Sequence, residues 1–148
     1  MSRALAALVV VVALTAPARA EWTAGGGAEV PLEGNGTSWT VRAALNGRFT
    51  GQFLLDTGAS ICVIGPVAAL RLDLTPTGQE VSLTTANGVV HAPLVRIATL
   101  DIGGHRAHDV DAVVTPAVPS PLAGLIGLSY LNNFQYSIDA KRRVLRFR

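Results

Sequence analysis

The chain has 148 residues and a formal net charge of +2 at pH 7. Arg3 and Arg19 lie in the first twenty residues, which hold no acidic residue, so residues 21–148 carry ten basic and ten acidic side chains. A chain without excess positive charge gives no reason to expect a nucleic-acid partner. Residues 21–148 are long enough for one domain around one hydrophobic core. The single cysteine, Cys62, excludes an internal disulfide.

The first twenty residues have the features of a secretory signal peptide. Arg3 is followed by a nearly all-apolar run at residues 4–16, which is too short for a comfortable membrane span. Ala18 and Ala20 then provide small residues at the spacing that a signal peptidase recognises. We expect cleavage after Ala20 and an exported protein, periplasmic or secreted. The alternative is an uncleaved segment that anchors the domain to the membrane through residues 4–16.

The next part of the chain predicts a flexible lead-in followed by strands. Residues 21–28 include three consecutive glycines, which are typical of a flexible segment. The folded domain is expected over residues 29–148, with residues 29–32 as a short strand and residues 33–36 as a turn. Residues 39–45 alternate apolar and polar side chains, which is the period of a β-strand.

A β-hairpin is expected next, because Asn46-Gly47 is a strong two-residue turn signal. The return strand, residues 48–55, leads to Asp56. The later pattern predicts a mostly β chain with two short helices. The helices are expected at residues 67–72, entered through Pro66, and from Ser129 onward, with Ser129 as the N-cap. The later strands are expected at residues 81–85, 89–102, 110–114, 135–139 and 144–147.

An apolar run at residues 53–55 leads directly into the motif Asp56-Thr57-Gly58-Ala59-Ser60. This order predicts a carboxylate at the end of a buried strand, where an acid is costly unless it is hydrogen-bonded. Thr57, Gly58 and Ser60 supply donors, and Gly58 lets the backbone turn sharply. The alternative interpretation is an Asx-turn, in which Asp56 bonds its own backbone.

Three motifs follow one another in an order that resembles the retropepsin-like aspartic proteases, most of all the single-domain versions exported by bacteria. They are Asp56–Ser60, the turn Ala86-Asn87-Gly88 and the segment Leu125-Ile126-Gly127. The resemblance spans residues 29–147 and implies an all-β fold, an acid-protease half-barrel with one or two short helices. It also implies an aspartic endopeptidase that hydrolyses peptide bonds.

The resemblance implies a role for each residue of the Asp56 motif. The family's chemistry needs two facing carboxylates and this chain has one Asp-Thr-Gly, so the implied enzyme is a homodimer with Asp56 from each copy. A water between the two carboxylates would attack the peptide bond, with no metal and no other cofactor. Thr57 would bond across the two-fold axis, and Gly58 and Ser60 would donate to the carboxylate.

The resemblance also assigns the other motifs. Ala86-Asn87-Gly88 would form a flap that closes over an extended peptide or protein substrate. Leu125-Ile126-Gly127 would be the apolar-apolar-Gly segment that supports the active-site loop. The last strand, residues 144–147, is the candidate for tying the two copies together.

Other chemistries have weaker support. Cys62 lies in an apolar run and is interpreted as a small buried hydrophobe. His105 and His108 are three apart in an expected turn and strand, so their side chains would point to opposite faces, which suits no metal. We interpret them as surface residues. The second hypothesis for the chain is a catalytically silent retropepsin-like module for binding or dimerisation.

Overall fold

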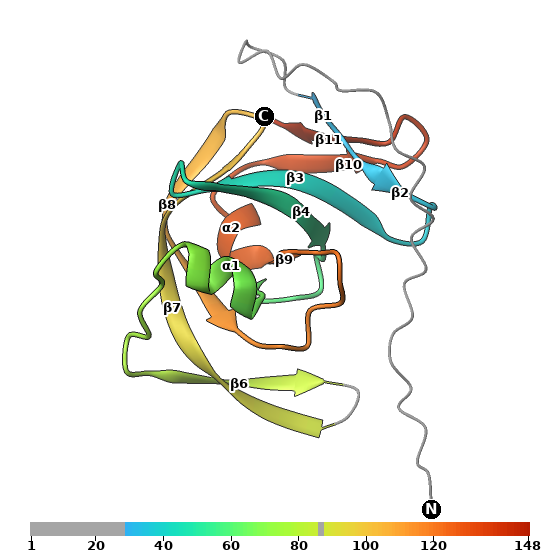
Figure 1. Cartoon of the computed structure of the whole chain (residues 1–148). Helices are drawn as coiled ribbons and strands as arrows, with labels where there is room; N and C mark the ends of the chain where they lie inside the picture. Colours follow the sequence, from blue (N-terminus) through green and yellow to red (C-terminus); the bar gives the residue numbers. More distant parts are fainter. Residues whose placement is uncertain (1–28, 86–87) are drawn as a thin grey trace, which may run out of the picture.

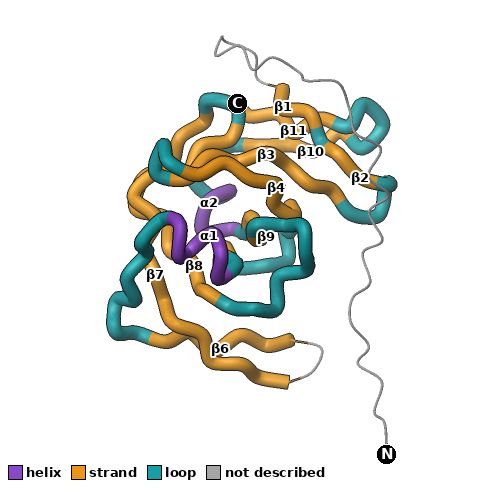
Figure 2. Tube along the Cα trace, viewed as in Figure 1, coloured by secondary structure: helices purple, strands orange, loops and turns teal. Residues whose placement is uncertain are grey.

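The computed structural model describes residues 29–85 and 88–148, which form two β-sheets and two short helices (Figure 1). Figure 2 shows strands through most of the fold, and the prediction of a mostly β chain is confirmed. The expected signal segment and lead-in, with Ala86 and Asn87 of the expected flap, lie outside the described residues. Neither helix in the described part is long and apolar enough to cross a membrane.

Most of the expected elements lie within two residues of their expected bounds, but residues 33–34 form a strand where a turn was expected, and β5 and β9 were not among the expected strands. The strands are β1 (Glu29–Pro31), β2 (Glu33–Gly34), β3 (Trp39–Leu45), β4 (Phe49–Leu55), β5 (Cys62–Ile64), β6 (Glu80–Thr85), β7 (Gly88–Ile102), β8 (His105–Val114), β9 (Gly124–Ile126), β10 (Tyr136–Asp139) and β11 (Val144–Phe147). The helices are α1 (Pro66–Arg71) and α2 (Leu128–Leu131).

The larger sheet closes on itself as a barrel. Its strands lie in the order β2-β3-β4-β9-β5-β8-β7-β6, and a further pairing joins β3 to β7 at Ala44–Asp101 and Leu45–Leu100. The strands from β3 to β7 in this order therefore surround one core, in which Leu45 and Leu100 are fully buried. Strand β6 lies outside the ring, so the β6–β7 hairpin projects from the barrel at the bottom of Figure 1.

The first hairpin forms where Asn46-Gly47 predicts it. Strands β3 and β4 pair antiparallel along their whole length, and Asn46 (φ 51°) and Gly47 (φ 62°) both have positive φ. A tight hairpin turn of the favoured hand requires this conformation. The backbone N–H of Asn46 donates to the carbonyl of Thr99 (2.8 Å), and its side-chain oxygen accepts from the N–H of Thr99 (2.9 Å). The hairpin that leads to Asp56 is therefore anchored to β7 at its far end.

Strand β8 begins at His105, whereas the sequence predicted a strand only from Val110. The residues between them are mostly polar, and Asp109 has a positive φ (53°), so they carry no strand signal of their own. They nevertheless pair with β7, from His105 opposite Ile102 onward. Pairing with a long buried neighbour decides the backbone here, as strand formation depends strongly on context.

The smaller sheet gathers the two ends of the domain, in the order β1-β11-β10 (top of Figure 1). Strand β11 is the central strand, with β1 and β10 antiparallel on its two sides. Both edges of β11 are hydrogen-bonded within its own chain, and the expectation that residues 144–147 tie two copies together stays a prediction. The free edges of this sheet belong to β1 and β10.

An aromatic cluster fixes the terminal sheet to the barrel. The ring of Phe147 stacks on His105 at a centroid distance of 4.4 Å and meets Phe134 edge-on at 5.2 Å. The hydroxyl of Tyr130 donates to the carbonyl of His105 (2.6 Å). The interpretation of His105 as a surface residue is therefore wrong: its ring is half-buried against Phe147, and its Nδ1 is buried without a hydrogen-bond partner among the described residues. His108 is exposed, as expected.

Candidate active site

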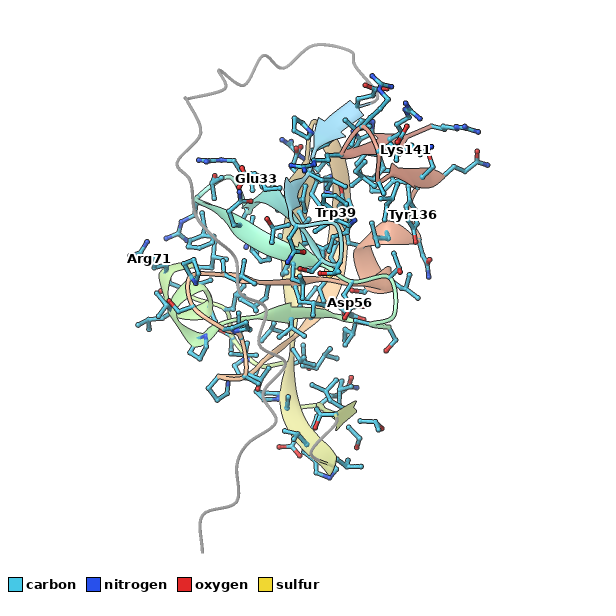
Figure 3. All side chains as sticks on the ribbon, turned by 90° about the vertical axis from the view of Figure 1, so that its right-hand side faces the viewer. Glu33, Trp39, Asp56, Arg71, Tyr136 and Lys141 are labelled. Carbon is cyan, nitrogen blue, oxygen red and sulfur yellow. The ribbon has the colours of Figure 1, made fainter. Side chains whose placement is uncertain are left out.

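Asp56 follows the last residue of β4, and its side chain is half-buried in the single chain. Figure 3 labels Asp56 in this view, with Trp39 above it and Tyr136 above it and further to the right. One oxygen of the carboxylate accepts a hydrogen bond from the N–H of Gly58 (2.9 Å). This contact has the geometry of an Asx-turn, so the local alternative and the active-site interpretation describe the same bond.

The remaining members of the motif lie toward solvent. Thr57, Gly58 and Ser60 are exposed, and Ala59 is half-buried. The backbone N–H of Ala59 donates to the carbonyl of Asp56 (3.3 Å), which closes the turn. Within residues 29–85 and 88–148, Gly58 donates to the carboxylate but the Ser60 hydroxyl does not. The expected contact of Thr57 across a two-fold axis stays a prediction.

The Leu125-Ile126-Gly127 segment lies directly beside the Asp56 loop. Strand β9 pairs in parallel with β4, so that Ile126 is opposite the last strand residue before Asp56. The N–H of Asp56 donates to the carbonyl of Ile126 (3.0 Å), and the N–H of Leu128 donates to the carbonyl of Ala59 (2.8 Å). Two motifs some seventy residues apart in the chain are therefore joined by hydrogen bonds at both ends of the loop.

Gly127 has no room for a side chain. A Cβ at this position would lie 2.6 Å from the carbonyl oxygen of Ile61 and 2.7 Å from that of Ala59. Both atoms belong to the backbone, so neither can rotate away. Gly127 is thus the residue that lets β9 and the start of α2 pass close to the Asp56 loop.

Ser129 is a residue whose contribution the sequence did not reveal. The expectation that it caps α2 is wrong, because Gly127 holds the N-cap position and no side chain caps the helix. The hydroxyl of Ser129 instead accepts from the N–H of Cys62 (2.9 Å) and donates to the carbonyl of Asp111 (2.8 Å). Only the tertiary fold brings these strands to the first turn of α2, so no local pattern could indicate the contact.

Cys62 is fully buried, which agrees with its interpretation as a small core residue. Its Sγ accepts from the N–H of Gly127 (3.3 Å). Burial raises the pKa of the thiol. The thiol therefore stays protonated and buried next to the loop, which does not suit a nucleophile.

The segment expected as a flap falls on the β6–β7 hairpin, and of its three residues only Gly88 is described. Thr85 and Gly88 are paired at its tip, where Gly88 has a positive φ of 114° and the hydroxyl of Thr85 donates to its carbonyl (2.8 Å). Val89 and Val90 are apolar side chains left 62% and 43% exposed on this hairpin. Because they are consecutive on β7, their side chains lie on opposite faces of the hairpin.

Four of the other aspartates in the described residues form ion pairs with arginine. The pairs are Asp73–Arg48 (3.3 Å), Asp111–Arg96 (2.9 Å), Asp101–Arg106 (3.3 Å) and Asp139–Arg146 (3.3 Å). Asp56 has no such partner in the described part of the chain. No three His, Cys, Asp or Glu side chains among the described residues gather as a set of metal ligands.

The comparisons with known proteins agree with this geometry. The profile of the family described as Aspartyl protease matches residues 41–130, a stretch that contains both the Asp56 loop and Leu125-Ile126-Gly127. The chain therefore belongs to the aspartyl protease family. Comparison with curated protein sequences gave no significant match.

The fold is retropepsin-like. The structure is similar to the crystal structure of a retropepsin-like aspartic protease from Rickettsia conorii, with a TM-score of 0.58 and 21% sequence identity. The match covers 80% of this chain and 87% of the other. The expected all-β, retropepsin-like fold is confirmed.

Proposed function

We propose that this protein is an aspartic endopeptidase that works as a homodimer. The observation that carries the proposal is the placement of Asp56: a single carboxylate at the end of β4, half-buried, without an arginine partner in the described residues, and hydrogen-bonded by the N–H of Gly58. An acid without a cationic partner, on a loop held by backbone hydrogen bonds, is available for proton transfer.

One chain supplies half of the chemistry. A two-fold axis next to the loop would bring Asp56 of one copy to Asp56 of the other. Two carboxylates at contact distance share one proton, because both cannot ionise cheaply. The ionised group would take a proton from a water between them as that water attacks the peptide carbonyl, and the protonated group would donate to the carbonyl oxygen.

The second copy would sit on the face shown in Figure 3. Trp39 and Tyr136 are half-buried aromatic side chains labelled above Asp56 in the same view, and Trp39 pairs with Leu55, the residue before Asp56. Large aromatic side chains at a half-exposed position favour a protein interface. Because β11 has no free edge, the contact would use this face and the free edges of β1 and β10.

The substrate would be an extended peptide held between the Asp56 pair and the β6–β7 hairpin of each copy. Such a segment binds by main-chain hydrogen bonds, with side chains in pockets on alternate sides. Ala86-Asn87-Gly88 would close over it and exclude water. The signal segment supports an exported enzyme, cleaved after Ala20, with a membrane anchor as the alternative.

The test is cleavage of a peptide library by the wild-type protein and by Asp56→Asn, from acidic to neutral pH. Asparagine keeps the size of the side chain and removes the ionisable group, so we expect activity to fall by at least about 10³-fold. The circular dichroism spectrum should not change, since Asp56 is not in the core. A variant with near-full activity would exclude Asp56 as the catalytic residue, and a wild-type protein that cleaves nothing would favour the silent module.

A further inference from the structure

The Asp56 loop is held from one side by the segment around Gly127. The N–H of Asp56 donates to Ile126, the residue before Gly127, and Leu128, the residue after it, donates to Ala59 at the other end of the loop. Because the two bonds flank Gly127, the position of the Gly127 peptide sets the position of the loop.

Gly127 is held in turn by Cys62. The N–H of Gly127 donates to Sγ of Cys62 at 3.3 Å, and neither residue is open to solvent. Sulfur is a weak acceptor, so this contact fixes Gly127 only if the backbone of Cys62 is itself fixed.

The hydroxyl of Ser129 fixes Cys62. It accepts from the backbone N–H of Cys62 on β5 and donates to the carbonyl of Asp111 on β8, at 2.9 and 2.8 Å. The Ser129 hydroxyl thus acts as both donor and acceptor and links β5 to β8. These two strands pair in parallel, beginning with Cys62 opposite Ala112. Cys62, which the Ser129 hydroxyl binds, is also the residue whose Sγ accepts the N–H of Gly127.

We propose that Ser129 is a positioning residue for Asp56, acting through Cys62 and Gly127. The inference rests on the proposed peptidase function, because its consequence is the alignment of two carboxylates across a two-fold axis. A small displacement of a reacting group costs rate without changing substrate contacts far from it.

The test compares three variants of the full chain. Ser129→Ala removes the hydroxyl and leaves the N–H of Cys62 and the carbonyl of Asp111 without this partner. Ser129→Thr keeps the hydroxyl. Asn133→Ala is the matched control, because the Asn133 side chain donates to the carbonyls of Ser129 (3.0 Å) and Tyr130 (2.8 Å) on the same helix but does not reach the loop.

Two readouts are needed. Amide hydrogen exchange should become about tenfold faster at Asp56 and Leu128 in Ser129→Ala, and remain unchanged there in Asn133→Ala. The kcat of Ser129→Ala should fall about tenfold to a hundredfold with KM within about twofold of wild type, and Ser129→Thr should recover most of it.

The outcomes separate this inference from the proposed function. Unchanged exchange at Asp56 and Leu128 in Ser129→Ala, or an equal change in Asn133→Ala, would overturn the positioning role. Full kcat in Ser129→Ala, with an active wild-type protein, would overturn it as well. Faster exchange confined to Ser129→Ala, in a protein that cleaves no peptide, would support the positioning of the loop and contradict the peptidase function.

Discussion

The Asp56 carboxylate is held mainly by backbone groups. The carboxylate accepts from the N–H of Gly58, and the backbone N–H of Asp56 donates to the carbonyl of Ile126, which is far away in the sequence. Backbone donors stay in place when side chains move, so the geometry of the acid depends on how closely β9 can approach. Gly127 controls that approach, because two backbone oxygens occupy the space that a Cβ would need.

Gly127→Ala should therefore destabilise the protein and displace the loop. Its Cβ would meet backbone atoms at 2.6 and 2.7 Å, so the backbone must shift, and overpacking of this kind costs about 1–3 kcal/mol. Urea unfolding measures this loss. Gly104→Ala is the comparison for backbone strain without a clash, because its φ is 84° and no heavy atom lies within 4 Å of a Cβ there. An unchanged free energy of unfolding in Gly127→Ala would show that the close approach does not matter.

At the scale of elements, β1 is fastened to the terminal sheet by charge as well as by pairing. The carboxylate of Glu29 accepts from Arg142 at 2.7 and 2.9 Å and from Arg146 at 2.8 Å. Hydrogen bonds from Arg146 and then Arg142 lower the pKa of Glu29 below its ordinary value of 4.5. Because the side chains are exposed, the contribution to stability is small and sensitive to salt.

The lowered pKa of Glu29 determines how the stability of the protein changes with pH. The folded state holds the Glu29 proton more weakly than the unfolded state, so the stabilisation is complete above pH 4.5 and is lost as the pH falls through the lowered pKa. Urea unfolding between pH 3 and 6 should show a smaller loss toward acid in Glu29→Gln than in wild type. Glu33→Gln, on exposed β2 and without an ion pair in the described residues, should match wild type. If the free energy of unfolding of Glu29→Gln and of wild type fell in parallel with pH, the ion pairs of Glu29 would not contribute to stability.

Some of the elements could be predicted because their signals are local. The Asn46-Gly47 turn, the alternation of β3 and the apolar run before Asp56 each need only their neighbours in the chain, and all three were found where expected. The first five residues of β8, the stacking of His105 and the bridge made by Ser129 depend on partners that the fold brings from elsewhere. No local pattern carries that information.

At the scale of the whole molecule, the barrel leaves one side of the site incomplete. The chain closes its large sheet through β3 and β7 and pairs both edges of β11, yet Asp56 stays half-exposed on an open face with Trp39 and Tyr136 (Figure 3). The family and the fold are those of the retropepsin-like aspartic proteases. Under the proposed function, a second copy would complete the site.

The central claim is that two Asp56 side chains, one from each copy, make one site. Mixing wild-type protein with Asp56→Asn, at constant total concentration and after the chains have exchanged, tests it most directly. If both carboxylates are needed, activity follows the square of the wild-type fraction, so an equal mixture keeps about a quarter of the activity. If each chain acts alone, the same mixture would keep about half, and that result would contradict the account.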